Sequence, residues 1–168
     1  MTPPYSPIYI RAEKANVLAS RHPWVWDRSI IEPAIHPEPG SIVDLMLIDG
    51  TWIGRGIYNP ASHIRVRVYQ WSNDAPLDEH WVQQQLALAC ELRDLWQRKH
   101  GALDAVRLVN SEGDGLSGLV IERFGKFAVI QVTAAGVHRW LPAIAKWLTQ
   151  RYALEGVLLS IDDKIAEA

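Results

Sequence analysis

The sequence predicts an α+β protein of two domains: a small β-barrel, then a small α/β domain with a mainly antiparallel sheet and two helices. Up to Trp71 the chain shows many short strand patterns and one short helical pattern. A polar segment, Ser72 to Pro76, then interrupts it. A long helical segment, three closely spaced strands, a second helix and a last strand follow.

The composition is that of a folded globular chain. With 168 residues, 48% of them hydrophobic, the chain can bury one sizeable core or two small ones. No apolar run has the length of a signal-peptide core or a membrane span. The single cysteine, Cys90, excludes an internal disulfide and a multi-cysteine metal site. These features predict a cytoplasmic protein with no membrane partner and no metal.

Charge is distributed unevenly along the chain. The net charge is −2, but the part up to Trp71 has seven basic and six acidic residues, which leaves −3 for the remainder. This balance argues against a strongly basic nucleic-acid binder, and it permits a local basic face on the first domain.

The early strands and the early helix follow from alternation and proline placement. Ile8 to Arg11 alternates as a short strand, and Trp24 to Trp26 alternates again. Between them, Glu13 to Arg21 fits a short helix that must end before Pro23.

The rest of the first domain is predicted as strands joined by tight turns. Ser41 to Ile48 is a strand, and Asp49-Gly50 is a strong hairpin signal that turns the chain into the next one. Gly54 and Gly56 in that next strand predict close approach of another backbone. Ile64 to Tyr69 alternates cleanly.

The second domain begins with a long helix. Asp78 or Asp74 can cap a helix from about Glu79 to Lys99, which Gly101 ends. Its apolar positions share one face at helical spacing. They are Val82, Leu86, Ala89, Leu92 and Trp96.

Three strands follow: Val106 to Val109, Leu119 to Phe124 and Phe127 to Val132. Ser111 to Gly115 forms an acidic turn between the first two. A second helix begins near His138, because Pro142 is tolerated only in a first turn. Its inward positions are Val137, Leu141, Ile144, Leu148 and Tyr152, and Gly156 to Ile161 is the last strand.

No catalytic constellation emerges from the residues. Cys90 lies mid-helix without a nearby histidine, so an ordinary helix cysteine is favoured over a nucleophile. The histidines lack H-x-x-x-H spacing, and His36-Pro37-Glu38 lacks the cysteines of a zinc deaminase. Glu112, Asp114 and Glu122 indicate turn chemistry rather than a catalytic carboxylate cluster. The eight tryptophans are expected mostly in cores, with stacking on bases as the alternative.

Basic residues of the first domain are the better candidates for function. Arg11, Lys14 and Arg21-His22 bracket the short helix, and Arg65 and Arg67 project from one side of a strand. Guanidinium groups on a shared face suit phosphate contact, and nearby aromatic rings suit unstacked bases. A solvated barrel surface is equally compatible with this spacing.

Two sets of motifs resemble a known family. Arg21 to Trp26, Gly54 to Ser62 and Ile64 to Val68 resemble a PUA domain, a small RNA-binding pseudo-barrel. The resemblance is to the PUA domain that opens the bacterial 23S rRNA large-subunit cytosine-5 methyltransferases. Arg107 to Gly125 resembles the central domain of the same family, so the similarity covers essentially the whole chain.

The resemblance implies a division of the chain and a partner. Residues 6–72 would be a PUA-like RNA-binding domain, residues 76–163 the central α/β domain, and residues 164–168 a truncated lead-in to a missing methyltransferase domain. The partner would be structured RNA, namely 23S rRNA. The RNA-binding surface is predicted to include Arg11, Lys14, Arg21, His22, Arg65 and Arg67.

Members of the family use S-adenosylmethionine and a cysteine nucleophile, which require a Gly-rich strand-to-helix turn and a thiolate. The sequence offers neither, and Ser160 to Lys164 departs from the Arg-Ser-Asp pattern of the family. We therefore expect no cofactor in this chain, no catalytic residue and no methyl transfer by it alone. The alternative is a stand-alone protein-interaction module or a degenerate remnant without an RNA role.

Overall fold

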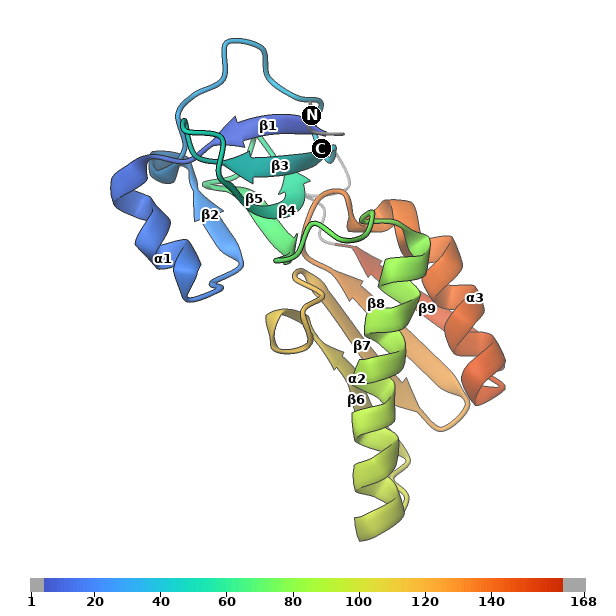
Figure 1. Cartoon of the computed structure of the whole chain (residues 1–168). Helices are drawn as coiled ribbons and strands as arrows, with labels where there is room; N and C mark the ends of the chain where they lie inside the picture. The colour runs from blue at the N-terminus through green and yellow to red at the C-terminus, as the bar shows by residue number, and fades with distance from the viewer. Residues whose placement is uncertain (1–4, 162–168) are drawn as a thin grey trace. The chain divides into compact units, whose positions relative to one another are not determined.

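The computed structural model describes residues 5–161, which form two compact units that meet in sequence between Leu77 and Asp78 (Figure 1). Each unit has its own sheet, so the predicted α+β class is confirmed. The predicted lead-in at residues 164–168 lies outside the described part of the chain.

The first unit is built on a five-stranded sheet of order β1-β3-β4-β5-β2. Its strands are β1 (Ser6–Tyr9), β2 (Trp24–Trp26), β3 (Ile42–Met46), β4 (Trp52–Tyr58) and β5 (Ile64–Gln70). β1 pairs in parallel with β3, and all the other pairs are antiparallel. A 3-10 turn, η1 (Ala12–Lys14), leads into the short helix α1 (Ala15–Ala19).

The two edges of this sheet are joined by a short bridge instead of a full ladder. Ile10 bridges Ile30, and the Ile31 amide donates to the Tyr9 carbonyl at 2.8 Å. The predicted barrel is thus a pseudo-barrel within residues 5–161, without continuous closure. Its core includes the fully buried side chains of Ile8, Leu45 and Tyr58.

Close backbone approach at the strand glycines is confirmed. A Cβ added to Gly56 would lie 2.2 Å from the Arg67 carbonyl oxygen on β5. The hairpin glycine Gly50 has φ +89°, a conformation that favours glycine, and Asp49 accepts from the Thr51 amide at 2.9 Å.

The second unit packs two helices with a four-stranded sheet of order β6-β7-β8-β9. Its elements are α2 (Glu79–His100), β6 (Ala105–Asn110), β7 (Leu119–Phe124), β8 (Phe127–Val132), α3 (Leu141–Tyr152) and β9 (Gly156–Ile161). Only the β8–β9 pair is parallel, so the mainly antiparallel sheet is confirmed. Asp78 is the observed cap of α2, and it accepts from the Trp81 amide at 2.9 Å.

The predicted inward face of α2 is correct in its first half and wrong in its second. Val82, Leu86 and Ala89 are buried, whereas Leu92 is 60% exposed and Trp96 51% exposed. The inward side of the later turns is polar, because Arg93, Asp94 and Gln97 bond to other parts of this unit. Leu92 and Trp96 therefore lie on the outward side of the helix. In α3 the inward positions Leu141, Ile144 and Leu148 are buried as predicted, and Pro142 lies in the first turn. The predicted start near His138 is wrong, because a 3-10 turn, η4 (Val137–Trp140), precedes the helix and α3 begins at Leu141.

Candidate nucleic-acid interface

An aromatic and cationic cluster lies on the solvent side of strands β2 and β5. Trp24 is paired with Arg67 across the two strands, and the Arg67 guanidinium carbon lies 5.6 Å from the Trp24 ring centroid. The His22 and Trp26 rings meet Trp24 edge-on, with centroid distances of 5.6 and 6.1 Å. We call His22, Trp24, Trp26 and Arg67 the tryptophan cluster.

Strand alternation explains why these side chains face outward. Val25 on β2 is buried, which turns its neighbours Trp24 and Trp26 to the opposite face. Val66 and Val68 on β5 are buried in the same way, so Arg67 projects beside Trp24. Trp26 is 37% exposed, which leaves aromatic surface open to solvent. A cation held over indole faces offers both phosphate contact and base stacking.

A second feature of the same unit is a hollow beside α1. Its volume is about 290 Å³. Its lining includes Arg21, Trp52 and Trp71. Arg21 ends the α1 segment with φ +58°, and the next residue, His22, belongs to the tryptophan cluster. The Arg21-His22 dipeptide therefore contributes to both features.

The structure separates the six predicted residues into different environments. His22 and Arg67 come together at Trp24, and Arg21 lines the α1 hollow. Arg11 donates from Nε to the Ile30 carbonyl at 3.0 Å. Arg65 donates from Nη1 to the carbonyls of Pro60 and Ser62, so it holds its own turn. Lys14 lies at the junction of η1 and α1.

Sequence reasoning missed a buried ion pair in the middle of the first unit. Arg55 on β4 and Asp44 on β3 are 2% and 0% exposed, with Nε and Oδ1 2.8 Å apart. Arg55 also donates to Asn73 Oδ1 and to the Ala75 carbonyl, both at 2.8 Å, and Trp52 Nε1 donates to Asp44 at 3.0 Å. The only signal in the sequence was an arginine between the two strand glycines.

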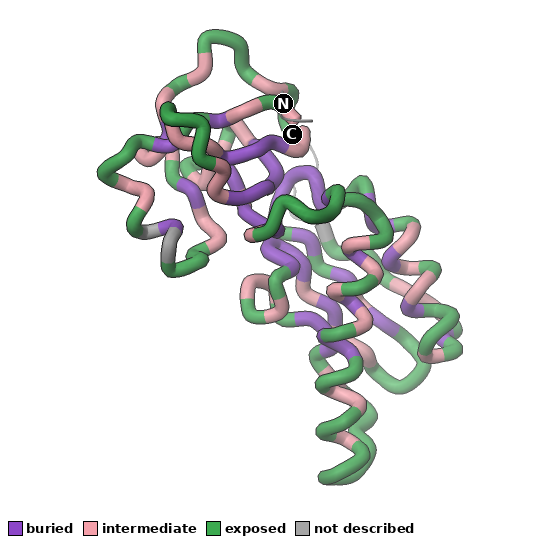
Figure 2. The backbone as a smooth tube through the Cα atoms, viewed as in Figure 1, coloured by how far each residue is buried: buried purple, intermediate pink, exposed green. Residues whose placement is uncertain are grey.

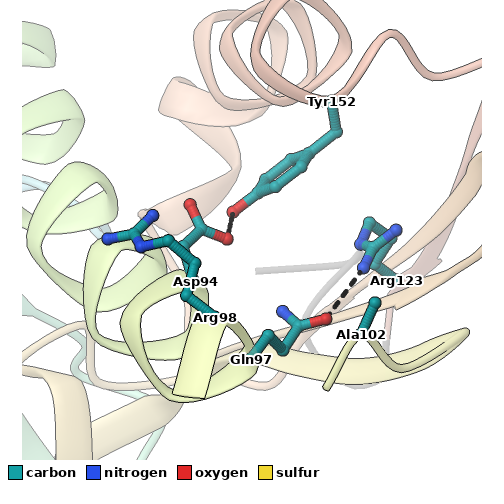
Figure 3. Close-up of a pocket in the computed structure, with 6 residues that line it drawn as sticks. All are labelled: Asp94, Gln97, Arg98, Ala102, Arg123 and Tyr152. Atoms are coloured by element: carbon teal, nitrogen blue, oxygen red, sulfur yellow. Dashed lines mark hydrogen bonds between the residues drawn. The ribbon is translucent and has the colours of Figure 1, made fainter. Parts of the chain in front are cut away.

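The second unit has its own polar hollow, of about 370 Å³, beside the end of α2 (Figure 3). The Tyr152 hydroxyl donates to Asp94 at 3.2 Å, and Arg151 binds the same carboxylate at 2.6 Å. Arg123 donates to Gln97 across the hollow. Burial raises the pKa of the Tyr152 hydroxyl. This arrangement holds α2 and α3 together.

The acidic turn and the cysteine have structural roles, as predicted. Asp114 receives two bonds of 2.7 Å from Arg93 and one of 2.6 Å from the Asn110 amide. Glu112 accepts from the Ser117 hydroxyl at 2.7 Å. Cys90 is fully buried on α2, and burial raises the pKa of its thiol.

Residues 5–161 contain no group of three or more His, Cys, Asp or Glu side chains that could hold a metal ion. No helix in that part of the chain is long and apolar enough to span a membrane.

Comparison with known proteins identifies the first unit. Residues 8–71 match the family model described as a PUA-like domain. The first unit is a PUA-like domain. The match covers the tryptophan cluster, the α1 hollow and the buried Arg55–Asp44 pair.

Relatives of the chain confirm the resemblance found in its motifs. It is 36% identical over 135 residues to the ribosomal RNA large subunit methyltransferase I of Erwinia tasmaniensis, and 34% identical over 150 residues to that of Salmonella arizonae. These alignments cover 80% and 89% of this chain and 34% and 37% of the relatives. The chain thus spans about a third of the length of the curated relatives it matches.

Solved structures share the fold. A protein described as a methyltransferase complexed with SAH matches with a TM-score of 0.79 at 16% identity, over 95% of this chain and 41% of its own. A protein of Streptococcus mutans described as a SAM-dependent methyltransferase matches with a TM-score of 0.75 at 14% identity. The match covers 93% of this chain and 40% of that protein.

Proposed function

We propose that this chain is the RNA-docking region of an S-adenosylmethionine-dependent 23S rRNA cytosine-5 methyltransferase. The PUA-like domain and the rRNA methyltransferase relatives support an RNA-binding role at the level of the family. The observation that carries the proposal for this chain is the tryptophan cluster, in which Arg67 lies against Trp24 on the solvent side of the domain.

The cluster suits RNA because it combines two kinds of contact. The Arg67 guanidinium is placed for a phosphate, and Trp24 and Trp26 present ring surface to an unstacked base. Arg21 and Lys14 extend positive charge from the cluster along the α1 segment. Arg11 and Arg65 shape this surface by holding loops, and we assign them a supporting role.

Methyl transfer belongs, in this proposal, to a domain that the 168 residues do not include. S-adenosylmethionine would bind there, and the substrate would be cytoplasmic ribosomal RNA. Cys90 is unsuited to attack a base because it is buried and because burial keeps its thiol protonated. The chain alone is expected to bind rRNA and to leave it unmethylated when S-adenosylmethionine is supplied.

The test is a binding titration of the 168-residue chain against a structured 23S rRNA fragment at two salt concentrations. Affinity should fall as salt rises. Arg67→Gln should weaken binding and should make the slope of log affinity against log salt concentration shallower by about one. Trp26→Ala should weaken binding by about tenfold, from the loss of one stacked base worth roughly 1–3 kcal/mol. Lys126→Gln removes an equal charge from an exposed residue of the second unit and should change little.

Two results would contradict the proposal in different ways. Binding that is absent, or that does not respond to salt, would favour a protein-interaction module. Binding that survives Arg67→Gln and Trp26→Ala unchanged would move the RNA surface away from the tryptophan cluster. Melting curves of both variants establish that the domain remains folded.

A further inference from the structure

Helix α2 carries a row of large apolar side chains that point into solvent. Leu88, Leu92, Leu95 and Trp96 are 62%, 60%, 52% and 51% exposed. Their spacing of four, three and one residues places them on one side of the helix. Figure 2 shows that most of the C-terminal half of α2 is exposed. We call these four residues the α2 stripe.

The α2 stripe is additional to the face by which the helix packs in its own domain. That face uses Val82, Leu86, Ala89 and Cys90, all buried. A helix with two apolar faces buries one of them in its domain and leaves the other for a partner. Contiguous exposed leucine and tryptophan side chains of this kind mark interaction surfaces in soluble proteins.

Two charged residues along one edge of the stripe indicate what the partner is. Glu91 and Arg98 lie seven residues apart, which is close to two helical turns, so they flank the stripe on the same side. Neither side chain has a hydrogen-bond or ion-pair partner within residues 5–161. By contrast, the neighbouring charges are paired inside the domain, Arg93 with Asp114 and Asp94 with Arg151.

We propose that the α2 stripe is the contact surface between two copies of this chain, with their α2 helices antiparallel. In a two-fold arrangement every contact occurs twice. A register that sets Glu91 opposite Arg98 of the second copy forms two reciprocal ion pairs. The same register brings Leu92 of each copy against Leu95 and Trp96 of the other. Parallel helices would instead set the two Glu91–Arg98 edges on opposite sides of the interface, so no Glu91–Arg98 pair could form between the copies.

The chemistry of the stripe separates it from the RNA surface. RNA contacts call for cations and accessible ring faces, whereas the stripe is mainly leucine and the Trp96 ring is stacked on His100 at 4.8 Å. The stripe is short, so the expected dimer is weak and in concentration-dependent exchange with monomer. The inference does not depend on RNA binding.

The experiment is sedimentation equilibrium of the 168-residue chain over a wide concentration range. A reversible monomer–dimer equilibrium is expected, and Leu92→Glu should abolish it. Leu158→Glu is the matched control, because Leu158 is 65% exposed on β9 in the same domain and should leave the equilibrium unchanged.

Charge exchange tests the orientation and the register. Glu91→Arg and Arg98→Glu should each weaken the dimer on the order of tenfold, since two attractive pairs become two repulsive ones. The double variant E91R/R98E should recover the dimer. A chain that is monomeric at every concentration overturns the proposal, as does dimerisation that Leu92→Glu leaves intact. Failure of the double variant to recover overturns the antiparallel register, and circular dichroism melts check folding.

Discussion

Removal of the buried guanidinium in the PUA-like domain should be strongly destabilising. The variant is Arg55→Met, which keeps much of the aliphatic volume and removes the charge. It leaves the Asp44 carboxylate, 0% exposed, with Trp52 Nε1 as its remaining side-chain donor. It also removes the donors to Asn73 and Ala75, which tie the segment after β5 to the domain.

The magnitude follows from the burial of the pair. Breaking a buried ion pair at one partner costs about 3–5 kcal/mol, a large part of the roughly 5–15 kcal/mol that holds a domain folded. The double variant D44L/R55M removes both charges and should cost less than Arg55→Met alone, because no buried charge remains unpaired. Its residual cost, about 1–2 kcal/mol, comes from the lost bonds of Trp52 and Ala75.

Urea unfolding followed by tryptophan fluorescence and circular dichroism measures these differences. The urea midpoint of the PUA-like domain should fall, and the urea midpoint of the second domain should stay the same. Lys126→Met, which breaks the exposed pair with Glu155, is the control and should have little effect. The reasoning is refuted if Arg55→Met costs less than about 1 kcal/mol, or if the double variant is as unstable as the sum of both single variants.

Two further predictions concern a glycine and the cysteine. Gly56→Ala should unfold the PUA-like domain in thermal melts, because the new Cβ would lie 2.2 Å from the Arg67 carbonyl oxygen. Gly50→Ala is the matched control, because a Cβ there meets nothing within 4 Å. It should lower the free energy of unfolding only by the strain of φ +89°, about 1 kcal/mol. Equal losses for the two variants would contradict this. Cys90 should resist a thiol reagent at pH 8 until the domain unfolds, because burial raises the pKa of the thiol above its ordinary value. Since the folded pKa is the higher one, the associated stability is complete below about pH 8.5 and declines above it. Rapid labelling of the native chain would refute the burial argument.

Much of the fold could be predicted because local rules decide it. The bounds of β2, β7, β8 and β9 match the predicted ones, since alternation and turn residues fix where a strand begins and ends. Close backbone approach at Gly56 could also be predicted, because a glycine inside a strand often marks such a contact. The motifs that resemble the rRNA methyltransferase family were also local, and the relatives confirmed them.

The candidate site could be predicted only in part. The sequence showed that Arg65 and Arg67 share a face of one strand, but it could not show that Arg65 binds carbonyls of its own turn while Arg67 lies on Trp24. That difference depends on the register between β2 and β5, which are separated by a long stretch of chain. The sequence placed Arg55 in a strand, yet its burial depends on Asp44 from another strand.

Helix α2 shows most clearly which features the sequence determines and which depend on the tertiary structure. Helical spacing identified its apolar positions, and a period of 3.6 residues is a property of the backbone alone. Which of those positions are buried depends on how the helix packs in its unit. In the later turns Arg93, Asp94 and Gln97 occupy the inward side, and Leu92 and Trp96 are exposed. The sequence by itself therefore determined the elements, the PUA-like motifs and the glycine contacts. Tertiary structure decided which arginine holds a turn, which lies against a tryptophan ring and which leucines face water, because burial depends on residues far apart in the chain.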